Sequence, residues 1–102
     1  MVINILDHIS YCHSHNDGEV IASLITPHLK RGEQITLSFS GVYSVPSSFV
    51  NSAFIRLLDE FTFEYIRGHL MFVHSTKQIN EMIKKRFDFE VNKRPKVGFC
   101  YA

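Results

Sequence analysis

Residues 35–49 read Ile-Thr-Leu-Ser-Phe-Ser-Gly-Val-Tyr-Ser-Val-Pro-Ser-Ser-Phe and cross three kinds of local structure in succession. From Gln34 to Phe39 polar and apolar residues alternate and β-forming residues dominate, which predicts a strand. Turn-forming residues follow from Gly41 to Pro46 and predict an irregular connector. An apolar pattern of helical spacing then begins, and Ser47 or Ser48 is its natural N-cap. A strand that passes through a short loop into a helix is the repeating unit of α/β proteins.

Strands and helices alternate along the rest of the chain. Before residue 35 the sequence predicts a strand over residues 2–9 and a helix from Asp17 to near Gly32, which Pro27 kinks or shortens. The helix that begins at Ser47 should continue to Phe61. A strand over residues 69–74 follows, and then a helix that is capped by Ser75 or Thr76 and runs to Phe87. Residues 95–102 predict an edge strand, because Val97, Phe99 and Tyr101 alternate there, and residues 93–102 are otherwise a tail. This order predicts a small layered α/β domain with three helices and a mixed, largely parallel sheet of about four strands.

Length and composition limit what the chain can be. At 102 residues it has room for one domain, residues 1–102, and its 45% apolar residues suffice for a core. The net charge of +1 does not provide the basic face that nucleic acid requires. No apolar run approaches the length of a membrane span, and the N-terminus lacks the basic region of a signal peptide. Two cysteines, Cys12 and Cys100, make no disulfide framework. We therefore expect a cytoplasmic protein that binds neither nucleic acid nor membrane.

A histidine-rich segment precedes the first predicted helix. His8, Cys12, His13 and His15, with Asp17 nearby, offer zinc-ligand chemistry. Structural zinc sites, however, draw ligand pairs of regular spacing from two elements, and the adjacent Cys12 and His13 do not easily turn toward one ion. A Cys12 nucleophile activated by a histidine would also need an orienting group and an oxyanion hole, for which no residues stand out. We expect a polar loop with no metal, no cofactor and no enzymatic activity.

Ser47 and Ser48 admit two interpretations. A helix N-terminus carries unpaired N–H groups and a partial positive charge, so it tolerates a phosphate, and phosphorylation there changes the surface that a partner meets. The plainer interpretation makes the two serines N-cap residues that accept hydrogen bonds from the first turn. From the residues alone, capping is favoured.

Three segments resemble a known group of domains. The run Ser38-Phe39-Ser40-Gly41-Val42, followed three residues later by Pro46-Ser47-Ser48-Phe49, resembles the strand and helix start of STAS domains and anti-sigma-factor antagonists, whose helix start bears a phosphorylated serine. Ser14-His15-Asn16-Asp17-Gly18 and Ser48-Phe49-Val50-Asn51-Ser52-Ala53-Phe54 are similar to Ser-Arg-x-Asp-Gly and Ser-Phe-Leu-x-x-Ala-Phe in the STAS-like domains of unknown function. Members of that branch often accompany histidine-kinase-like ATPases. The resemblance extends from Ser14 to Phe87, and its motifs keep their order.

The chain departs from these family patterns at several positions. Ser38 stands where the family strand often has Asp, and His15 stands where the first motif has Arg. Pro46 and Phe49 flank the serine pair in place of Asp and Gly. Because these two neighbours belong to the segment that a kinase would engage, they favour capping over phosphorylation for Ser47.

The resemblance implies a STAS-like fold and a non-enzymatic regulatory module, bacterial or phage in origin, that binds a protein such as a histidine-kinase-like ATPase. Loops at the carboxyl ends of parallel strands meet at one edge, so both motif loops should lie together there. The expected partner-binding residues are Ser14, Asp17, Gly18, Ser40, Gly41, Ser47, Ser48 and Phe49, with Ser47 as the candidate for phosphorylation. The alternative is a small structural protein of a mobile element that self-associates, as a homodimer, through the edge strand over residues 95–102.

Overall fold

The structure of the protein, a computed structural model, describes residues 1–93. Its elements follow one another as β1 (Val2–Asn4), η1 (Ile5–Asp7), α1 (His15–Lys30), β2 (Ile35–Ser38), α2 (Ser47–Ala53), η2 (Ile55–Asp59), α3 (Phe63–His69), β3 (Leu70–Val73) and α4 (Lys77–Lys93), where η marks a 3₁₀ helix. Strands and helical segments alternate as the sequence predicts. None of the helices within residues 1–93 is long and apolar enough to span a membrane.

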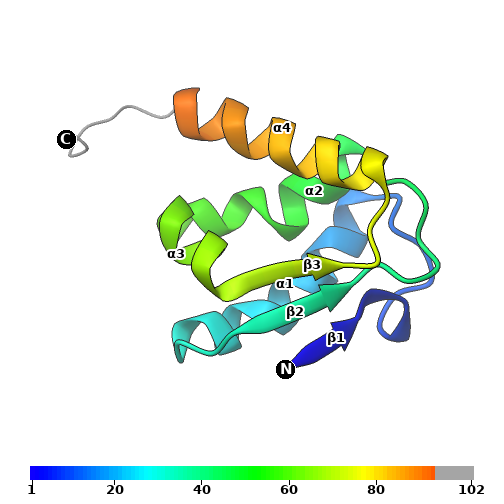
Figure 1. The fold of residues 1–102 in the computed structure, drawn as a ribbon, viewed down its shortest axis with the longest axis horizontal. Coiled ribbons are helices and arrows are strands. Elements are labelled where there is room, and N and C mark those ends of the chain that lie inside the picture. Colours follow the sequence, from blue (N-terminus) through cyan, green and yellow to red (C-terminus); the bar gives the residue numbers. More distant parts are fainter. Residues whose placement is uncertain (94–102) are drawn as a thin grey trace.

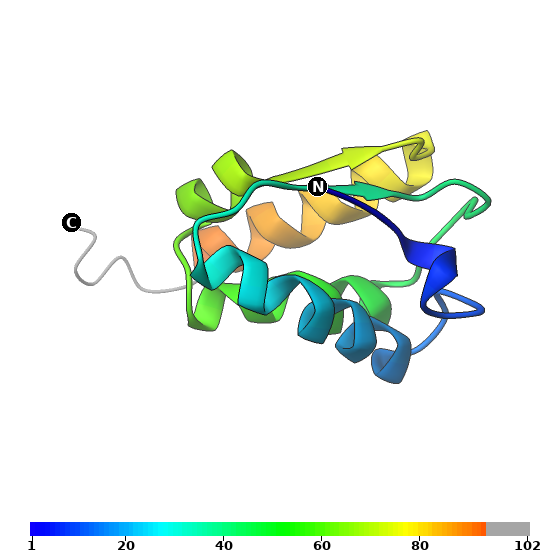
Figure 2. The ribbon, with the colours of Figure 1, turned by 90° about the horizontal axis from the view of Figure 1, so that it is seen from below.

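The strands form one parallel sheet in the order β1-β2-β3. Ile3, Leu37 and Phe72 lie in register on one face of the sheet. Val2 and Met71 occupy the opposite face. The helices α1, α2 and α4 pack against the first face (Figures 1 and 2), so Leu37 is fully buried whereas Val2 and Met71 are exposed. The core therefore lies between one layer of strands and one layer of helices.

The prediction of a mixed sheet with about four strands and three helices is wrong in its counts. Within residues 1–93 the sheet has three strands, all parallel, and there are four α-helices. The first strand ends at Asn4 instead of Ile9, because the chain turns into η1 at Ile5, whose side chain is fully buried. The edge strand predicted over residues 95–102 lies outside the described residues.

The helix predicted from Ser47 to Phe61 is two elements rather than one. The α-helix ends at Ala53, and Phe54, whose φ of −124° leaves the helical range, leads into η2. The helix α3 is absent from the sequence prediction altogether. Its start is nevertheless signalled by a cap, because Thr62 Oγ1 accepts a hydrogen bond from the N–H of Tyr65 (3.1 Å).

Pro27 does not shorten α1, so of the two predicted effects, a kink or a shortening, the shortening is wrong. The helix continues through Pro27 to Lys30 and terminates near Gly32, as predicted, with Gly32 at a φ of +76°. The N–H of Gly32 donates to the carbonyl oxygen of Leu29, and the N–H of Glu33 donates to that of His28, both at 3.0 Å. The proline is exposed in the last turn, where its missing N–H removes a single bond near the helix end.

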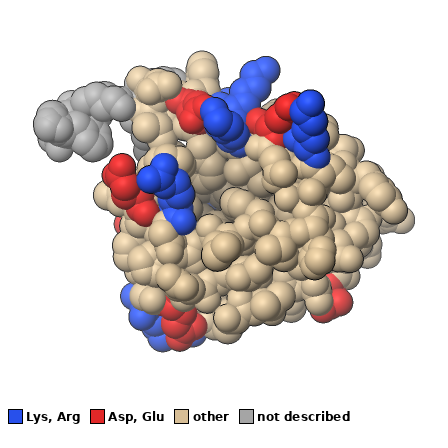
Figure 3. Space-filling model, viewed as in Figure 1, with Lys and Arg blue, Asp and Glu red and all other residues tan. Residues whose placement is uncertain are grey.

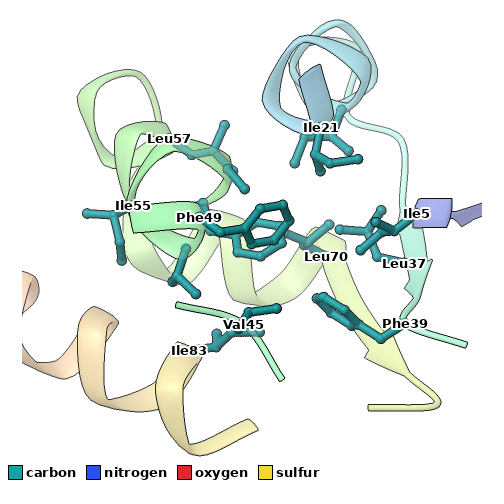
Figure 4. Close-up of a cluster of buried hydrophobic side chains, with 14 of the residues drawn as sticks. Ile5, Ile21, Leu37, Phe39, Val45, Phe49, Ile55, Leu57, Leu70 and Ile83 are labelled. Carbon is teal, nitrogen blue, oxygen red and sulfur yellow. The ribbon is translucent and has the colours of Figure 1, made fainter. Parts of the chain in front are cut away.

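Phenylalanines from separate segments fill the centre of the core. Phe54 meets Phe39 edge-on with ring centroids 6.4 Å apart and meets Phe49 edge-on at 6.1 Å. Phe72 of β3 packs on Phe54 with centroids 5.1 Å apart. Edge-to-face pairs of this kind contribute about 0.5–1.5 kcal/mol beyond their area burial. Figure 4 shows Ile21 of α1 reaching the same cluster from the other side.

The helices α1 and α2 touch at Gly18, in the first turn of α1. A Cβ atom there would lie 2.6 Å from the carbonyl oxygen of Phe49 and 2.9 Å from the backbone nitrogen of Ala53, and it would overlap Ser52 Oγ. Ser52 is buried at this contact, and its hydroxyl donates to the carbonyl oxygens of Ser48 (3.1 Å) and Phe49 (3.3 Å). Only glycine therefore allows the two backbones to approach so closely.

We predict that Gly18→Ala lowers the free energy of unfolding by about 1–3 kcal/mol or more, because the new methyl group meets backbone atoms that cannot move aside. Adding Ser52→Ala should not restore stability, since the overlap with the Phe49 carbonyl remains. Gly68→Ala is the matched control. Apart from the backbone of α3 itself and the adjacent residues, no atom lies within 4 Å of a Cβ placed at Gly68, so alanine there should stabilise by up to about 1 kcal/mol. Urea denaturation measures these changes, and equal midpoints for Gly18→Ala and Gly68→Ala would contradict the close contact.

Candidate functional site

The three parallel strands lead into three connecting segments at their carboxyl ends. Residues 8–14 follow β1 and η1, residues 39–46 follow β2, and residues 74–76 follow β3. Because the strands are parallel, all three segments lie at one edge of the sheet, on the right in Figure 1. We call this surface, formed by residues 8–14, 39–48 and 74–76, the loop edge.

The connector after β2 begins with a tight turn. The N–H of Val42 donates to the carbonyl oxygen of Phe39 (2.8 Å), and Gly41, the third residue of the turn, has a φ of +87°. A type II turn has this positive φ at its third residue and therefore favours glycine there. A side chain at Gly41 would also meet Leu6 Cδ1 at 2.9 Å, so η1 lies directly beside the turn.

The start of α4 holds the rest of this connector. The side-chain amide of Gln78 binds Val45 twice, because Oε1 accepts from the Val45 N–H (3.0 Å) and Nε2 donates to its carbonyl oxygen (3.1 Å). Thr76 Oγ1 donates to the carbonyl oxygen of Tyr43 (2.7 Å) and accepts from the N–H of Ile79 (3.2 Å), so it caps α4 as predicted. Residues 43–45 are therefore fixed at the backbone, although they belong to no strand or helix.

Two tyrosines project from the loop edge. Tyr43 is 81% exposed and Tyr11 is 64% exposed. Tyr11 stacks on His13 with ring centroids 5.2 Å apart, which restricts the motion of its ring. The sequence analysis misses both tyrosines, although each is an aromatic residue within a polar, turn-rich loop. Large aromatic side chains in such loops have no core to enter, and that is the signal that would have identified them.

The first motif builds the start of α1. Ser14 Oγ accepts from the N–H of Asp17 (3.2 Å), and Asp17 Oδ2 accepts from the N–H of Ser14 (3.2 Å), which is a capping box. Asp17 Oδ2 also accepts from the N–H of His13 (3.2 Å). Of the residues predicted to bind a partner, Ser14 is thus exposed at the loop edge, Asp17 is committed to the cap, and Gly18 is buried against α2.

The second motif has an exposed half and a buried half. Ser47 and Ser48 are exposed at the start of α2, and Ser40 and Gly41 are exposed in the turn. Phe49 is fully buried in the core, so a partner cannot contact its ring. The structure therefore brings four of these five predicted residues to the surface at the loop edge.

The predicted N-cap at Ser47 or Ser48 is wrong. Pro46 is the cap residue, because its carbonyl oxygen accepts from the N–H of Val50 (3.3 Å) and its ψ of 164° is extended. Ser47 and Ser48 are the first two residues of the helix, and α2 has no side-chain cap. A proline fits this position, since the cap residue makes no intrahelical bond through its N–H.

Cys12 lies beneath the loop edge. Its side chain is 3% exposed, and burial, followed by the negative charge of Asp17, raises the pKa of its thiol to about 11. Such a thiol is protonated at neutral pH, and the protonated form is a poor nucleophile.

The histidines near Cys12 have other contacts. His13 is engaged in its aromatic stack, and His15 Nε2 pairs with Glu19 Oε2 at 3.1 Å. No group of three or more His, Cys, Asp or Glu side chains within residues 1–93 gathers for a metal ion.

The loop edge thus presents aromatic rings and hydroxyl groups on a fixed backbone. Its exposed members include the tyrosines and serines Tyr11, Ser14, Ser40, Tyr43, Ser47 and Ser48, together with the histidines His8, His13 and His74. Tyrosine is enriched at protein interfaces because its ring packs on apolar surface while its hydroxyl forms hydrogen bonds. The arrangement is chemically suited to contact with another protein.

A protein-family model described as STAS-like domain of unknown function (DUF4325) matches residues 17–80. The match begins at Asp17 of the capping box, contains the contact between α1 and α2 and the connector after β2, and ends in the first turn of α4. No curated protein and no solved structure matches the chain. The matched region therefore includes residues 39–48 and 74–76 of the loop edge, which are the connector after β2, the start of α2 and the segment after β3.

We predict that Ser14→Ala costs about 1 kcal/mol of stability, whereas Ser47→Ala changes it by less than about 0.5 kcal/mol. Ser14 Oγ accepts a hydrogen bond from the first turn of α1, while Pro46 holds the corresponding position of α2. Thermal melts of the two variants measure the difference. A loss at Ser47 as large as the loss at Ser14 would restore the capping role to Ser47.

In a Cys100→Ser background, Cys12 should react slowly with a thiol reagent at neutral pH and faster as the pH rises toward 11, since only the thiolate reacts. The fold favours the neutral thiol, because the pKa of Cys12 is about 11 in the folded state against an ordinary value of 9.0. The stability that this shift contributes is complete below pH 9.0 and is lost as the pH rises toward 11. Stopped-flow labelling measures the rate. Labelling of the folded protein at neutral pH as fast as that of free cysteine would contradict the burial.

Proposed function

Because the chain belongs to the STAS-like domains of unknown function, we propose that it is a regulatory module that binds another protein and catalyses no reaction. The observation that carries the proposal is the exposure of Tyr43, which is 81% exposed. It lies on a backbone segment that forms three hydrogen bonds with the side chains of Thr76 and Gln78. Tyr11 adds a second exposed ring at the same sheet edge. Exposed aromatic rings on a fixed backbone are typical of protein-binding surfaces.

The fixed backbone lowers the free-energy cost of binding. A loop that orders only on binding loses conformational entropy at that moment, whereas residues 43–45 are already bonded to Thr76 and Gln78. A tyrosine has only two side-chain torsions to immobilise, so it offers a large contact area at little further cost. We therefore assign to Tyr43 the central position in the interface, where aromatic residues provide much of the binding energy.

We propose a histidine-kinase-like ATPase as the partner. The support is the resemblance of the Ser14–Gly18 and Ser48–Phe54 motifs to those of domains that accompany such ATPases. Both motifs border the loop edge, one at the start of α1 and the other at the start of α2. A partner that binds across the loop edge would face both helix starts as well as Tyr43.

Ser47 adds a regulatory element to the proposal. Its side chain is exposed beside the connector, and α2 does not use it as a cap. A phosphate on Ser47 would bring negative charge to the loop edge without breaking α2, since a helix start tolerates negative charge. We propose that phosphorylation of Ser47 lowers the affinity for the partner. Pro46 and Phe49, which replace the Asp and Gly of the family pattern, serve as the helix cap and as part of the core.

Self-association is the second candidate function. Among the described strands β3 pairs only with β2, and Met71 on it is exposed. A small structural protein of a mobile element would self-associate through residues 95–102, and a free strand edge of this kind on a second copy could receive them. Sedimentation equilibrium separates the two functions, because a stable homodimer that tolerates substitutions at Tyr43 favours self-association.

We predict that Tyr43→Ser weakens binding to a purified histidine-kinase-like ATPase from the same organism by about 1–3 kcal/mol, because the interface loses an aromatic anchor. Val2→Ser is the matched control. Val2 is 67% exposed but lies at the start of β1, at the opposite end of the sheet, so its substitution should leave the affinity unchanged. Isothermal titration calorimetry measures both affinities.

Ser47→Asp and Ser47→Ala extend the same titration. Aspartate imitates part of the phosphate charge and should weaken binding, whereas alanine should not. Equal affinities for Tyr43→Ser and wild type, with both proteins folded, would remove the loop edge from the interface. The absence of binding to any such ATPase would refute the proposed partner while leaving the family unaffected.

A further inference from the structure

The loop edge contains no formally charged residue. Its three segments, residues 8–14, 39–48 and 74–76, hold no Asp, Glu, Lys or Arg, so the eleven Lys and Arg and the ten Asp and Glu of the chain all lie elsewhere. Charged residues make up 21% of the sequence, and in proteins such residues are mostly exposed. Their absence from three surface segments that meet at one edge therefore distinguishes the loop edge from the rest of the surface.

Figure 3 shows where the charges lie instead. Charged side chains gather over α4 and at the end of the molecule away from the loop edge, whereas the right-hand side, where the loop edge lies in Figure 1, is almost without them. Along α4 they form pairs, since Lys77 Nζ lies 3.9 Å from Glu81 Oε2 and Lys84 Nζ lies 2.8 Å from Asp88 Oδ2. Asp7, directly before the first segment, is exposed and borders the uncharged surface.

The groups that hold the loop edge in place add no free charge to it. The carboxylate of Asp17 accepts hydrogen bonds from the N–H groups of His13 and Ser14, both at 3.2 Å, so it is committed to the start of α1. The connector after β2 is fixed by the hydroxyl of Thr76 and the amide of Gln78, which are uncharged. The loop edge therefore offers a partner only aromatic rings, hydroxyl groups, imidazoles and backbone.

An uncharged surface selects its partner through desolvation. When two protein surfaces meet, water leaves the contact, and a charged group that faces no opposite charge loses its hydration without compensation. The loop edge has no opposite charge to offer, so it disfavours a partner that places Asp, Glu, Lys or Arg against Tyr43. Apolar groups lose nothing in this contact, and uncharged polar groups can form hydrogen bonds with the serine hydroxyls. The centres of known protein interfaces show the same depletion of charge.

We propose that the loop edge binds an uncharged patch of its partner protein, built from apolar side chains and side chains with hydroxyl or amide groups. This inference rests on the proposed function and specifies the surface that the partner presents. Because no charges face one another, association proceeds without electrostatic steering, at a rate constant of about 10⁵–10⁶ M⁻¹s⁻¹. A charge of either sign at the loop edge lowers the affinity, and a phosphate on Ser47 is one such charge.

Salt dependence is the first test. Isothermal titration calorimetry with a purified histidine-kinase-like ATPase from the same organism measures the dissociation constant at pH 8, where histidine is ordinarily neutral. We expect this constant to change by less than about twofold between about 0.05 and 0.5 M NaCl, because no charge pair across the interface is there to be screened.

Charge substitutions at Ser44 are the second test. Ser44 is exposed beside Tyr43, on the segment that Thr76 and Gln78 fix. Ser44→Asp and Ser44→Lys should each weaken binding by about tenfold or more, whereas Ser44→Asn, which has the size of aspartate without its charge, should bind like the wild type. Val2→Asp and Val2→Lys place the same charges at the opposite end of the sheet and should leave the affinity unchanged. Thermal melts verify that each variant is folded.

Three results would overturn the inference while the proposed function stands, because the wild type binds in each of them. One is an affinity that falls by about tenfold or more over the same range of salt concentration. Another is tighter binding by Ser44→Asp or by Ser44→Lys, since the partner would then present the opposite charge. The third is wild-type affinity in both charged variants. Failure of the wild type to bind at any salt concentration would instead refute the proposed partner, and this inference with it.

Discussion

At Gly18 the backbones of α1 and α2 approach so closely that no side chain fits between them, and the arrangement of the domain follows from this contact. With α1 fixed against α2, Phe49 and Phe54 enter the core and pack with Phe39, the residue directly after β2. The connector that starts at Phe39 and ends at α2 is thereby anchored at both ends. The exposed position of Tyr43 on that connector is thus a consequence of core packing, reinforced by the hydrogen bonds from α4.

The two family motifs are the two halves of that helix contact. The first supplies the capping box of α1 and the glycine, and the second supplies Ser52 and the buried face of α2. Membership of the STAS-like family rests on a match that contains all of the second motif and, of the first, Asp17 and Gly18. Family membership therefore describes how the chain folds. Binding specificity belongs to the residues that the core does not need, and Tyr43 and Tyr11 are the largest of these at the loop edge.

Sequence patterns predict the features that depend on neighbouring residues. The alternation in β2, the spacing of α1, its end near Gly32 and the cap at Thr76 are all local, and each is confirmed. The break after Ala53 and the burial of Gly18 and Phe49 depend on segments that meet only in the folded chain, so the sequence alone did not reveal them. The cap of α2 was predicted at a serine because serine side chains can accept hydrogen bonds from the first turn of a helix. The actual cap residue, Pro46, forms no such side-chain bond and contributes only its carbonyl oxygen.

Native-state hydrogen exchange tests most directly whether the contact at Gly18 organises the fold. If it does, amides in the middle of α1 and α2 exchange only through global unfolding, with equal protection free energies, while those of α3, which lies outside the contact, exchange through smaller local openings. Exchange of the α2 amides by local opening, while α1 stays protected, would contradict the account, because the two helices would then be independent units.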